Sequence, residues 1–150
     1  MTKLYYAALG YLVLGLASGL FYREFTKLNG YTAADGFTQL SVVHTHLLTL
    51  GVIVLLVVLV LEKAFALSES RAFGWFFWIY NIGLVVTASA MTVNGGLHVL
   101  GLESSKALAG VSGSGHILLT AGLLLLFVAL GRRLRATTSP QAAAPASAAR

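Results

Sequence analysis

The sequence predicts an all-α fold, a transmembrane four-helix bundle with both termini cytoplasmic, and two observations predict it: composition and the spacing of apolar residues. Of 150 residues, 57% are hydrophobic and only 10% are charged, which lies far outside the range of soluble globular domains. The apolar residues fall into four long runs, and four spans of about 20 residues each use more than half of the length. We therefore expect one transmembrane domain over residues 1–136, set in a lipid bilayer.

The first apolar run covers residues 4–22 and lies between Lys3 and Arg23. Its length is sufficient to cross a bilayer. A cleaved signal peptide is the alternative, because residues 17–19 are small enough for a cleavage site. However, a single Lys precedes the run, and its apolar core is long for such a peptide. We expect a retained span.

The other three runs are also long enough to cross a bilayer, and they cover residues 37–61, 72–93 and about 111–130. The third run opens with an aromatic cluster over residues 73–80, which is typical of side chains anchored at the membrane interface. We expect it to end at residues 94–96, Asn-Gly-Gly, and the fourth run to begin in the turn-prone stretch 112–115. The tail, residues 137–150, is rich in Ala, Pro and Ser and is predicted to be disordered.

The distribution of cations predicts the orientation. An even number of spans places both termini on one side, and seven of the ten Lys and Arg residues lie on that side. Because cytoplasmic loops carry an excess of Lys and Arg, we expect cytoplasmic termini in a multi-pass protein of the cytoplasmic membrane. The positive charge then sets orientation, and no nucleic-acid partner is expected.

The four histidines all fall close to the predicted outer face, and every one of them is a candidate metal ligand: His44, His46, His98 and His116. Cysteine is absent, which excludes disulfides, thiolate ligands and the covalent attachment of a c-type haem. A metal centre must therefore use histidine, methionine or carboxylate. Polar side chains that face lipid are costly, so these histidines are expected to turn towards partners.

Two of these histidines, His44 and His46, point about 200° apart on a regular helix, so they cannot easily share one ion. We expect them to contact two different partners, either two metal centres or one metal centre and a hydrogen-bonding or intersubunit partner. Zinc, copper and haem iron all accept imidazole ligands. Haem b suits the setting best, because a large apolar macrocycle fits between helices and needs only one or two axial imidazoles. One or more haem groups are expected, and copper is the alternative.

Three further residues are candidates for binding the cofactor. Gly51 lies seven residues after His44 and Gly113 lies three residues before His116, so each shares a face with its histidine and would let a porphyrin approach the backbone. Ordinary helix packing explains such glycines as well. Arg23 could pair with haem propionates at the outer face, because charge-assisted pairs with carboxylates are strong.

Several classes of function are disfavoured. No Asp, Glu, Lys or Arg lies within the four apolar runs, although a carboxylate proton relay or an ion-coupled transporter would usually contain one. No Ser-His-Asp combination or H-E-x-x-H motif supports hydrolysis. Transport and hydrolysis are therefore disfavoured, and whether the chain is an enzyme stays open.

The segment Val-Val-His-Thr-His-Leu-Leu at residues 42–48 resembles the helix of haem-copper oxidase catalytic subunits in which an H-x-H pair serves two haems. The resemblance covers this one helix. It implies that His44 faces a high-spin or copper-adjacent centre and that His46 ligates a low-spin haem, with His116 as the second axial ligand and His98 left for a metal or a propionate. The resembled subunits are built from three similar arcs of four helices, which implies a homotrimer of this chain.

The sequence thus leads to one principal expectation about function. It predicts a membrane b-type haem protein, with haem ligated by histidine near the outer face, that transfers electrons to a redox partner or binds or senses a diatomic gas. Two alternatives stay open. One is a non-haem copper or zinc protein for metal handling or cofactor assembly, and the other is a structural membrane subunit without a cofactor.

Overall fold

Four long helices dominate the computed structural model, which describes residues 1–138. The second of them, residues 40–65, is continuous but consists of three segments, an α-helix, a π-helix and another α-helix. Short 3₁₀ turns, η1 (Ala33–Asp35) and η3 (Leu67–Glu69), lie in two of the connections. The helical segments are α1 (Thr2–Leu28), α2 (Leu40–His46), η2 (Leu47–Ile53), α3 (Val54–Phe65), α4 (Arg71–Val99) and α5 (Lys106–Thr138).

Each of the four helices is long and apolar enough to cross a membrane, which confirms the predicted fold class at this level. They contain 27, 26, 29 and 31 residues in the spanning segments, all more than the roughly 20 that a bilayer requires. The structure is thus consistent with a multi-pass membrane protein. Between residues 1 and 138 the chain forms helices and turns and no strand.

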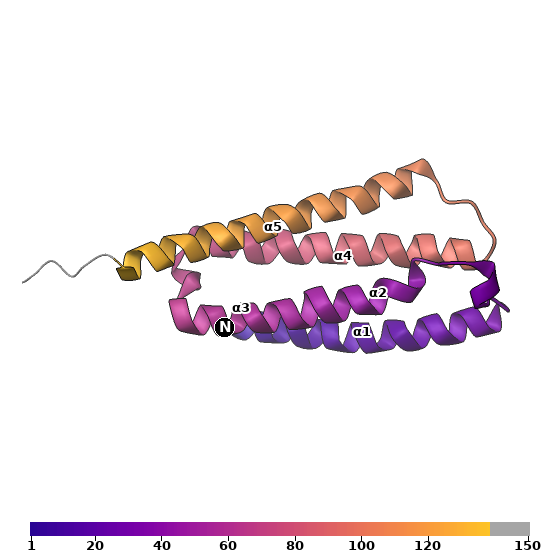
Figure 1. The fold of residues 1–150 in the computed structure, drawn as a ribbon, viewed down its shortest axis with the longest axis horizontal. Coiled ribbons are helices and arrows are strands. Elements are labelled where there is room, and N and C mark those ends of the chain that lie inside the picture. Colours follow the sequence, from indigo (N-terminus) through magenta and orange to yellow (C-terminus); the bar gives the residue numbers. More distant parts are fainter. Residues whose placement is uncertain (139–150) are drawn as a thin grey trace, which may run out of the picture.

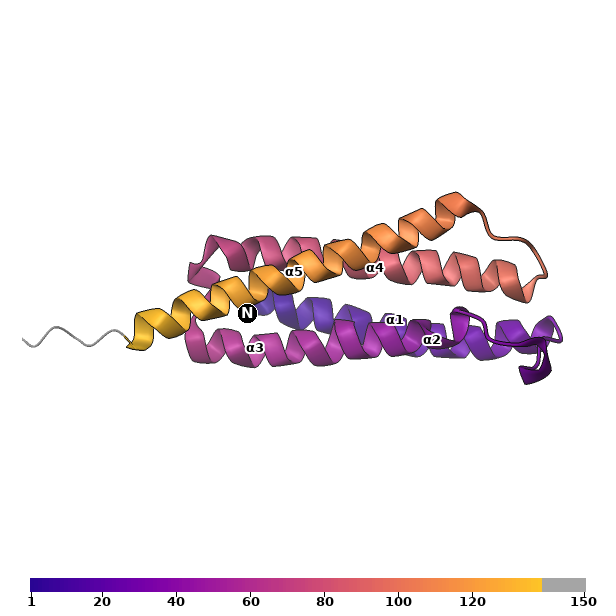
Figure 2. The same ribbon diagram turned by 45° about the horizontal axis from the view of Figure 1, so that its top comes forward.

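The helices run alternately up and down, so that the N-terminus and the C-terminal end of α5 lie towards one end of the molecule (Figure 1). We call this the terminal end, and we call the other the distal end, where the α1–α2 and α4–α5 connections lie. The helix α1 packs along the second helix, and α5 packs along α4. Towards the distal end, α5 diverges from α4, as both ribbon views show (Figures 1 and 2).

Glycines allow α4 and α5 to approach closely. A Cβ atom added at Gly122 would lie 2.9 Å from the Cβ of Tyr80, and one added at Gly115 would collide with the hydroxyl of Thr87. The buried residues of α5 recur at alternating spacings of four and three, which is the pattern of helices packed at a shallow angle. They are Gly115, Leu119, Gly122, Leu126 and Ala129.

The second helix packs against its neighbours in the same manner. Gly51 lies under the ring of Tyr11 from α1, where an added Cβ would be 2.5 Å from two atoms of that side chain. On the other side, Gly95 of α4 lies against the backbone of Leu40. These close contacts place the second helix between α1 and α4.

Two of the expected helix boundaries were wrong. The third helix does not end at residues 94–96 but continues to Val99. Gly95 lies inside this helix, where it makes room for the backbone of Leu40 rather than forming a turn. The fourth helix begins at Lys106 and includes residues 112–115, where Gly115 packs against Thr87. At its other end α5 continues to Thr138, while the rest of the tail predicted to be disordered lies outside the described residues.

Candidate functional site

His46 is the last residue of α2, and its imidazole is held by the backbone one turn earlier. Its Nδ1 lies 3.0 Å from the carbonyl oxygen of Val42. A carbonyl oxygen only accepts hydrogen bonds, so Nδ1 carries the proton and donates it. The second ring nitrogen, Nε2, then keeps its lone pair. The side chain is half-buried.

His116 on α5 repeats this arrangement. Its Nδ1 lies 2.9 Å from the carbonyl oxygen of Ser112, again one turn earlier, and the side chain is exposed. The hydroxyl of Thr120 donates to the carbonyl of His116 at 2.9 Å, which satisfies the backbone of the same turn. Both imidazoles therefore offer Nε2 as an acceptor or metal ligand, in the tautomer that metal-binding histidines adopt when Nδ1 donates to a carbonyl.

The two imidazoles both lie on the distal side of the contacts made by Tyr80 of α4. The hydroxyl of Tyr80 donates to the carbonyl of Leu50 at 3.0 Å, and its backbone packs on Gly122 of α5. His46 lies four residues before Leu50 and His116 lies six residues before Gly122, in each case towards the distal end.

The side chains that follow His116 along its face of α5 pack against the bundle. Leu123 and Leu130, seven and fourteen residues later, are half-buried against the core. Farther along, Arg133 joins α5 to the second helix, because its Nε donates to the carbonyl of Phe65 at 2.8 Å. Leu50 and Val54, which follow His46 on the second helix, also pack against the core. Thr120 and Ile53, which also follow the two histidines, are exposed, so each histidine stands at the margin of the core-facing side of its helix.

His44 leaves the second helix in a different direction and packs against α1. A Cβ atom added at Gly19 would lie 3.7 Å from the Cβ of His44. Its Nδ1 is buried without a hydrogen-bond partner, and its Nε2 lies 3.4 Å from the hydroxyl of Thr45. The structure therefore assigns His44 and His46 to different surroundings, and His44 contributes a buried nitrogen at the α1 interface.

His98 belongs to the distal surface rather than to the interior. It is exposed, its Nδ1 is 3.5 Å from the hydroxyl of Tyr31, and the two rings meet edge to face with centroids 5.8 Å apart. The neighbouring turn η1 is closed by Asp35, whose carboxylate accepts from the backbone N–H and the hydroxyl of Thr32. These hydrogen bonds, the backbone one foremost, hold the pKa of Asp35 below its ordinary value.

The four histidines do not form one centre. Across residues 1–138, no three side chains of His, Asp or Glu come close enough together to hold a metal ion. The arrangement instead offers two matched imidazoles, those of His46 and His116, together with His44 at the α1 interface and His98 at the surface. Each of these imidazoles could supply one nitrogen ligand to a cofactor or metal.

The comparisons with known proteins identify the family. The sequence profile of the family described as "Protein of unknown function (DUF2871)" matches residues 1–133, which includes all four spanning helices up to Arg133. The chain belongs to the DUF2871 family. No curated protein and no solved structure matches it.

The three remaining residues predicted for cofactor binding in this DUF2871 chain differ in their surroundings. Arg23 is exposed, and its Nε lies 3.6 Å from the carboxylate of Glu24. Gly51 is covered by the ring of Tyr11, so the expected space for a porphyrin at this position is filled by α1. Gly113, in contrast, has no atom of another segment within 4 Å of an added Cβ, so its face of α5 is open.

Sequence reasoning missed the role of Tyr80 and the π-helix η2. The aromatic cluster at residues 73–80 was predicted to lie at the membrane interface. Trp75 and Trp78 are 64% and 58% exposed, as such anchoring requires, but Phe76 and Tyr80 are fully buried and cannot anchor the helix in lipid. Their spacing of four residues places both on one face of α4, and this was the signal that could have separated them from the tryptophans.

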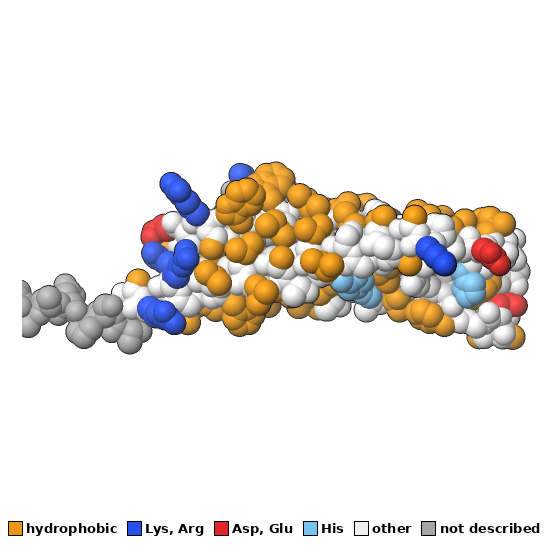
Figure 3. Space-filling model, turned by 90° about the horizontal axis from the view of Figure 1, so that it is seen from above, with side chains coloured by type: hydrophobic (Ala, Val, Ile, Leu, Met, Phe, Trp, Pro, Cys, Tyr) orange, Lys and Arg blue, Asp and Glu red, His pale blue; other side chains and the backbone are white. Residues whose placement is uncertain are grey.

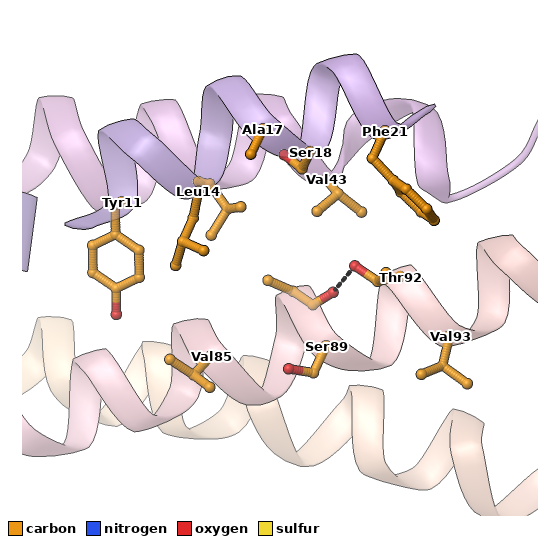
Figure 4. A pocket seen from close by; sticks show the side chains of 12 residues that line it. Tyr11, Leu14, Ala17, Ser18, Phe21, Val43, Val85, Ser89, Thr92 and Val93 are labelled. Carbon is orange, nitrogen blue, oxygen red and sulfur yellow. Dashed lines mark hydrogen bonds between the residues drawn. The ribbon is translucent and has the colours of Figure 1, made fainter. Parts of the chain in front are cut away.

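An apolar groove of about 510 Å³ lies between α1 and α4, with the second helix as its floor. Figure 4 shows Tyr11, Leu14 and Phe21 on one side and Val85, Ser89 and Val93 on the other. None of the four histidines lines this groove. The groove and the pair formed by His46 and His116 are thus separate features of the DUF2871 chain.

Proposed function

We propose that this chain is a membrane b-type haem protein in which His46 and His116 are the axial ligands. The observation that carries the proposal is the shared geometry of the two imidazoles, each of which donates from Nδ1 to the carbonyl four residues earlier. This bond fixes the tautomer and the ring orientation, which is how proteins prepare a histidine to ligate a metal through Nε2.

The donor set fits a haem. Two imidazoles on two different helices, each bonded to its own backbone through Nδ1, would supply nitrogens to hold the iron of a haem through Nε2. The open surface at Gly113 provides room beside His116. When bound, the haem would supply one-electron redox chemistry and an iron site for a diatomic gas. The protein would supply the two ligands, an apolar setting and a barrier to water.

We limit the proposed activity to electron transfer, with a redox partner, or the binding of a diatomic gas. The four spans carry no Asp, Glu, Lys or Arg between residues 4–22, 37–61, 72–93 and 111–130. A one-electron carrier or a gas-binding site needs no ionised side chain within the membrane, and this charge-free setting supports the limit.

Protein purified in detergent and supplied with haem tests the proposal. We expect a Soret band, with sharp α and β bands after reduction, as two axial imidazoles produce. His46→Ala and His116→Ala should each abolish the low-spin spectrum, because one axial nitrogen is lost. His98→Ala is the matched control and should keep it, since His98 lies at the surface beside Tyr31. A colourless wild-type protein, or a spectrum unaffected by either of the first two substitutions, would contradict the proposal.

A further inference from the structure

A π-helix begins directly after His46. The segment η2 covers Leu47–Ile53, seven residues within an otherwise α-helical span. A π-helix accommodates an additional residue per turn, and one residue corresponds to about 100° of rotation in an α-helix. The direction in which His46 points, relative to the rest of the second helix, therefore depends on whether η2 keeps this geometry.

The hydroxyl of Tyr80 bonds to the backbone of η2. It donates to the carbonyl of Leu50 at 3.0 Å, in the middle of the π-helix, and the Tyr80 side chain is fully buried. A hydrogen bond is more valuable where water is absent, because an unpaired hydroxyl or carbonyl there loses its solvation without compensation. Tyr80 therefore stabilises the one arrangement of η2 in which the carbonyl of Leu50 faces α4.

The same residue is also in close contact with α5. The backbone nitrogen, Cα and Cβ of Tyr80 would lie 2.9–3.1 Å from a Cβ atom at Gly122, six residues from His116. Tyr80 is thus in contact with both helices that carry the matched imidazoles, through its hydroxyl on one side and its backbone on the other.

We propose that Tyr80 is a positioning residue for the pair formed by His46 and His116. Its hydroxyl maintains η2 in the π-helical form and thereby sets the direction of His46, while its contact with Gly122 sets the depth of His116. The consequence for haem ligation rests on the proposed function, but the effect on the direction and tautomer of His46 does not.

Tyr80→Phe removes only the hydroxyl, and Tyr11→Phe is its matched control. Tyr11 is also a buried tyrosine whose hydroxyl faces a backbone carbonyl, but that carbonyl belongs to Asn81 of α4 rather than to η2. In Tyr80→Phe we expect the amides of residues 47–54 to exchange hydrogen for deuterium about tenfold faster than in the wild type, the factor that the loss of one hydrogen bond of ordinary strength produces. Exchange in α1 and α5 should not change.

The second readout is the ¹⁵N spectrum of the His46 imidazole. In the wild type and in Tyr11→Phe it should report one tautomer with the proton on Nδ1. In Tyr80→Phe it should report a mixture, because His46 leaves the carbonyl of Val42 when η2 relaxes. In haem-loaded protein, the same variant should shift the spectrum from low spin to a mixture of low and high spin.

A glycine substitution gives an independent route. Gly122→Ala should displace Tyr80 and reproduce the changes in η2, whereas Gly131→Ala, where no atom of another segment lies within 4 Å, should not. Faster exchange in all helices with an unchanged His46 spectrum would show a merely structural role and overturn the proposal. So would identical results for Tyr80→Phe and Tyr11→Phe. If no haem binds to the wild type, the proposed function fails, and the exchange and ¹⁵N results still decide the role of Tyr80.

Discussion

The orientation of a histidine ring becomes fixed when one of its two nitrogens forms a hydrogen bond with the backbone of its own helix. In His46 and His116 the bond from Nδ1 to the carbonyl four residues earlier removes the freedom of the ring and leaves Nε2 as the only open position. His44 lacks such a bond, and its buried Nδ1 is without a partner. The three histidines therefore differ in whether a hydrogen bond from Nδ1 fixes the ring orientation, although their side chains are chemically the same.

The pH response of Asp35 is a prediction at this scale. Because hydrogen bonds from Thr32 lower the pKa of Asp35 in the folded protein, its ionised form stabilises η1 at pH values above the ordinary pKa of an aspartate, about 4, and this contribution is lost as the pH falls through the lowered value. We expect the amide resonance of Thr32 to be constant from pH 7 to about pH 5 and to move only in stronger acid. Asp35→Asn should remove this titration, and movement that persists in the variant would contradict the assignment.

The histidines were identifiable from sequence, and so was the divergence of His44 and His46, because helical rotation alone fixes it. Their hydrogen bonds were not. Whether an imidazole turns back to its own helix or reaches a neighbour depends on what the neighbour presents. Gly19 beside His44 and the ring of Tyr11 over Gly51 come from α1, far away in the sequence. The function of Gly51 in helix packing, rather than beside a porphyrin, could be decided only with α1 in place.

At the scale of the elements, glycines determine how closely the helices pack. Read from sequence, Gly95 and Gly115 looked like helix ends, since glycine is common in turns and at helix termini. Both instead lie inside helices at close contacts, Gly95 with Leu40 and Gly115 with Thr87. The sequence alone does not distinguish a glycine that allows close helix packing from a glycine that forms a turn. The π-helix η2 was not predicted either, and the hydrogen bond that reaches its middle, from Tyr80 to the carbonyl of Leu50, comes from α4.

The close contact of α4 and α5 predicts a difference between two neighbouring glycines. In Gly115→Ala the new methyl group would collide with the hydroxyl of Thr87 and lie 2.9 Å from its backbone nitrogen, so we expect a loss of about 1–3 kcal/mol in the free energy of unfolding.

Gly113→Ala is the matched control, because it has no such neighbour and should be neutral or more stable by up to about 1 kcal/mol, since alanine favours the helix. Unfolding in mixed micelles of increasing sodium dodecyl sulfate measures both variants. Equal stability of the two would contradict the close packing of α4 and α5.

For the whole molecule, the distribution of charge is the guide to its orientation. Lys and Arg gather at the terminal end, next to the start of the tail, and are sparse along the rest of the visible face (Figure 3). We propose, from the excess of cations on that side, that the termini are cytoplasmic. A cytoplasmic reporter fused after residue 150 should then be active, and a reporter that functions only outside the membrane should be inactive. The reverse pattern would overturn the orientation.

The oligomeric state is a second prediction at this scale. From the likeness of residues 42–48 to an H-x-H helix found in assemblies of three four-helix arcs, we propose a homotrimer. Native mass spectrometry of protein released from mild detergent should show three copies of the 15.8 kDa chain. Cross-linking in the membrane is the control against dissociation in detergent, and a monomer in both experiments would contradict the trimer.

The molecule consists of two helical hairpins, α1 with the second helix and α4 with α5, and Leu40 of the first packs on Gly95 of the second. His46 belongs to one hairpin and His116 to the other. Any change in the angle between the hairpins would therefore change the separation of the two imidazoles. Because helices accommodate bilayer thickness by tilting, the thickness of the surrounding bilayer would be one physical cause of such a change.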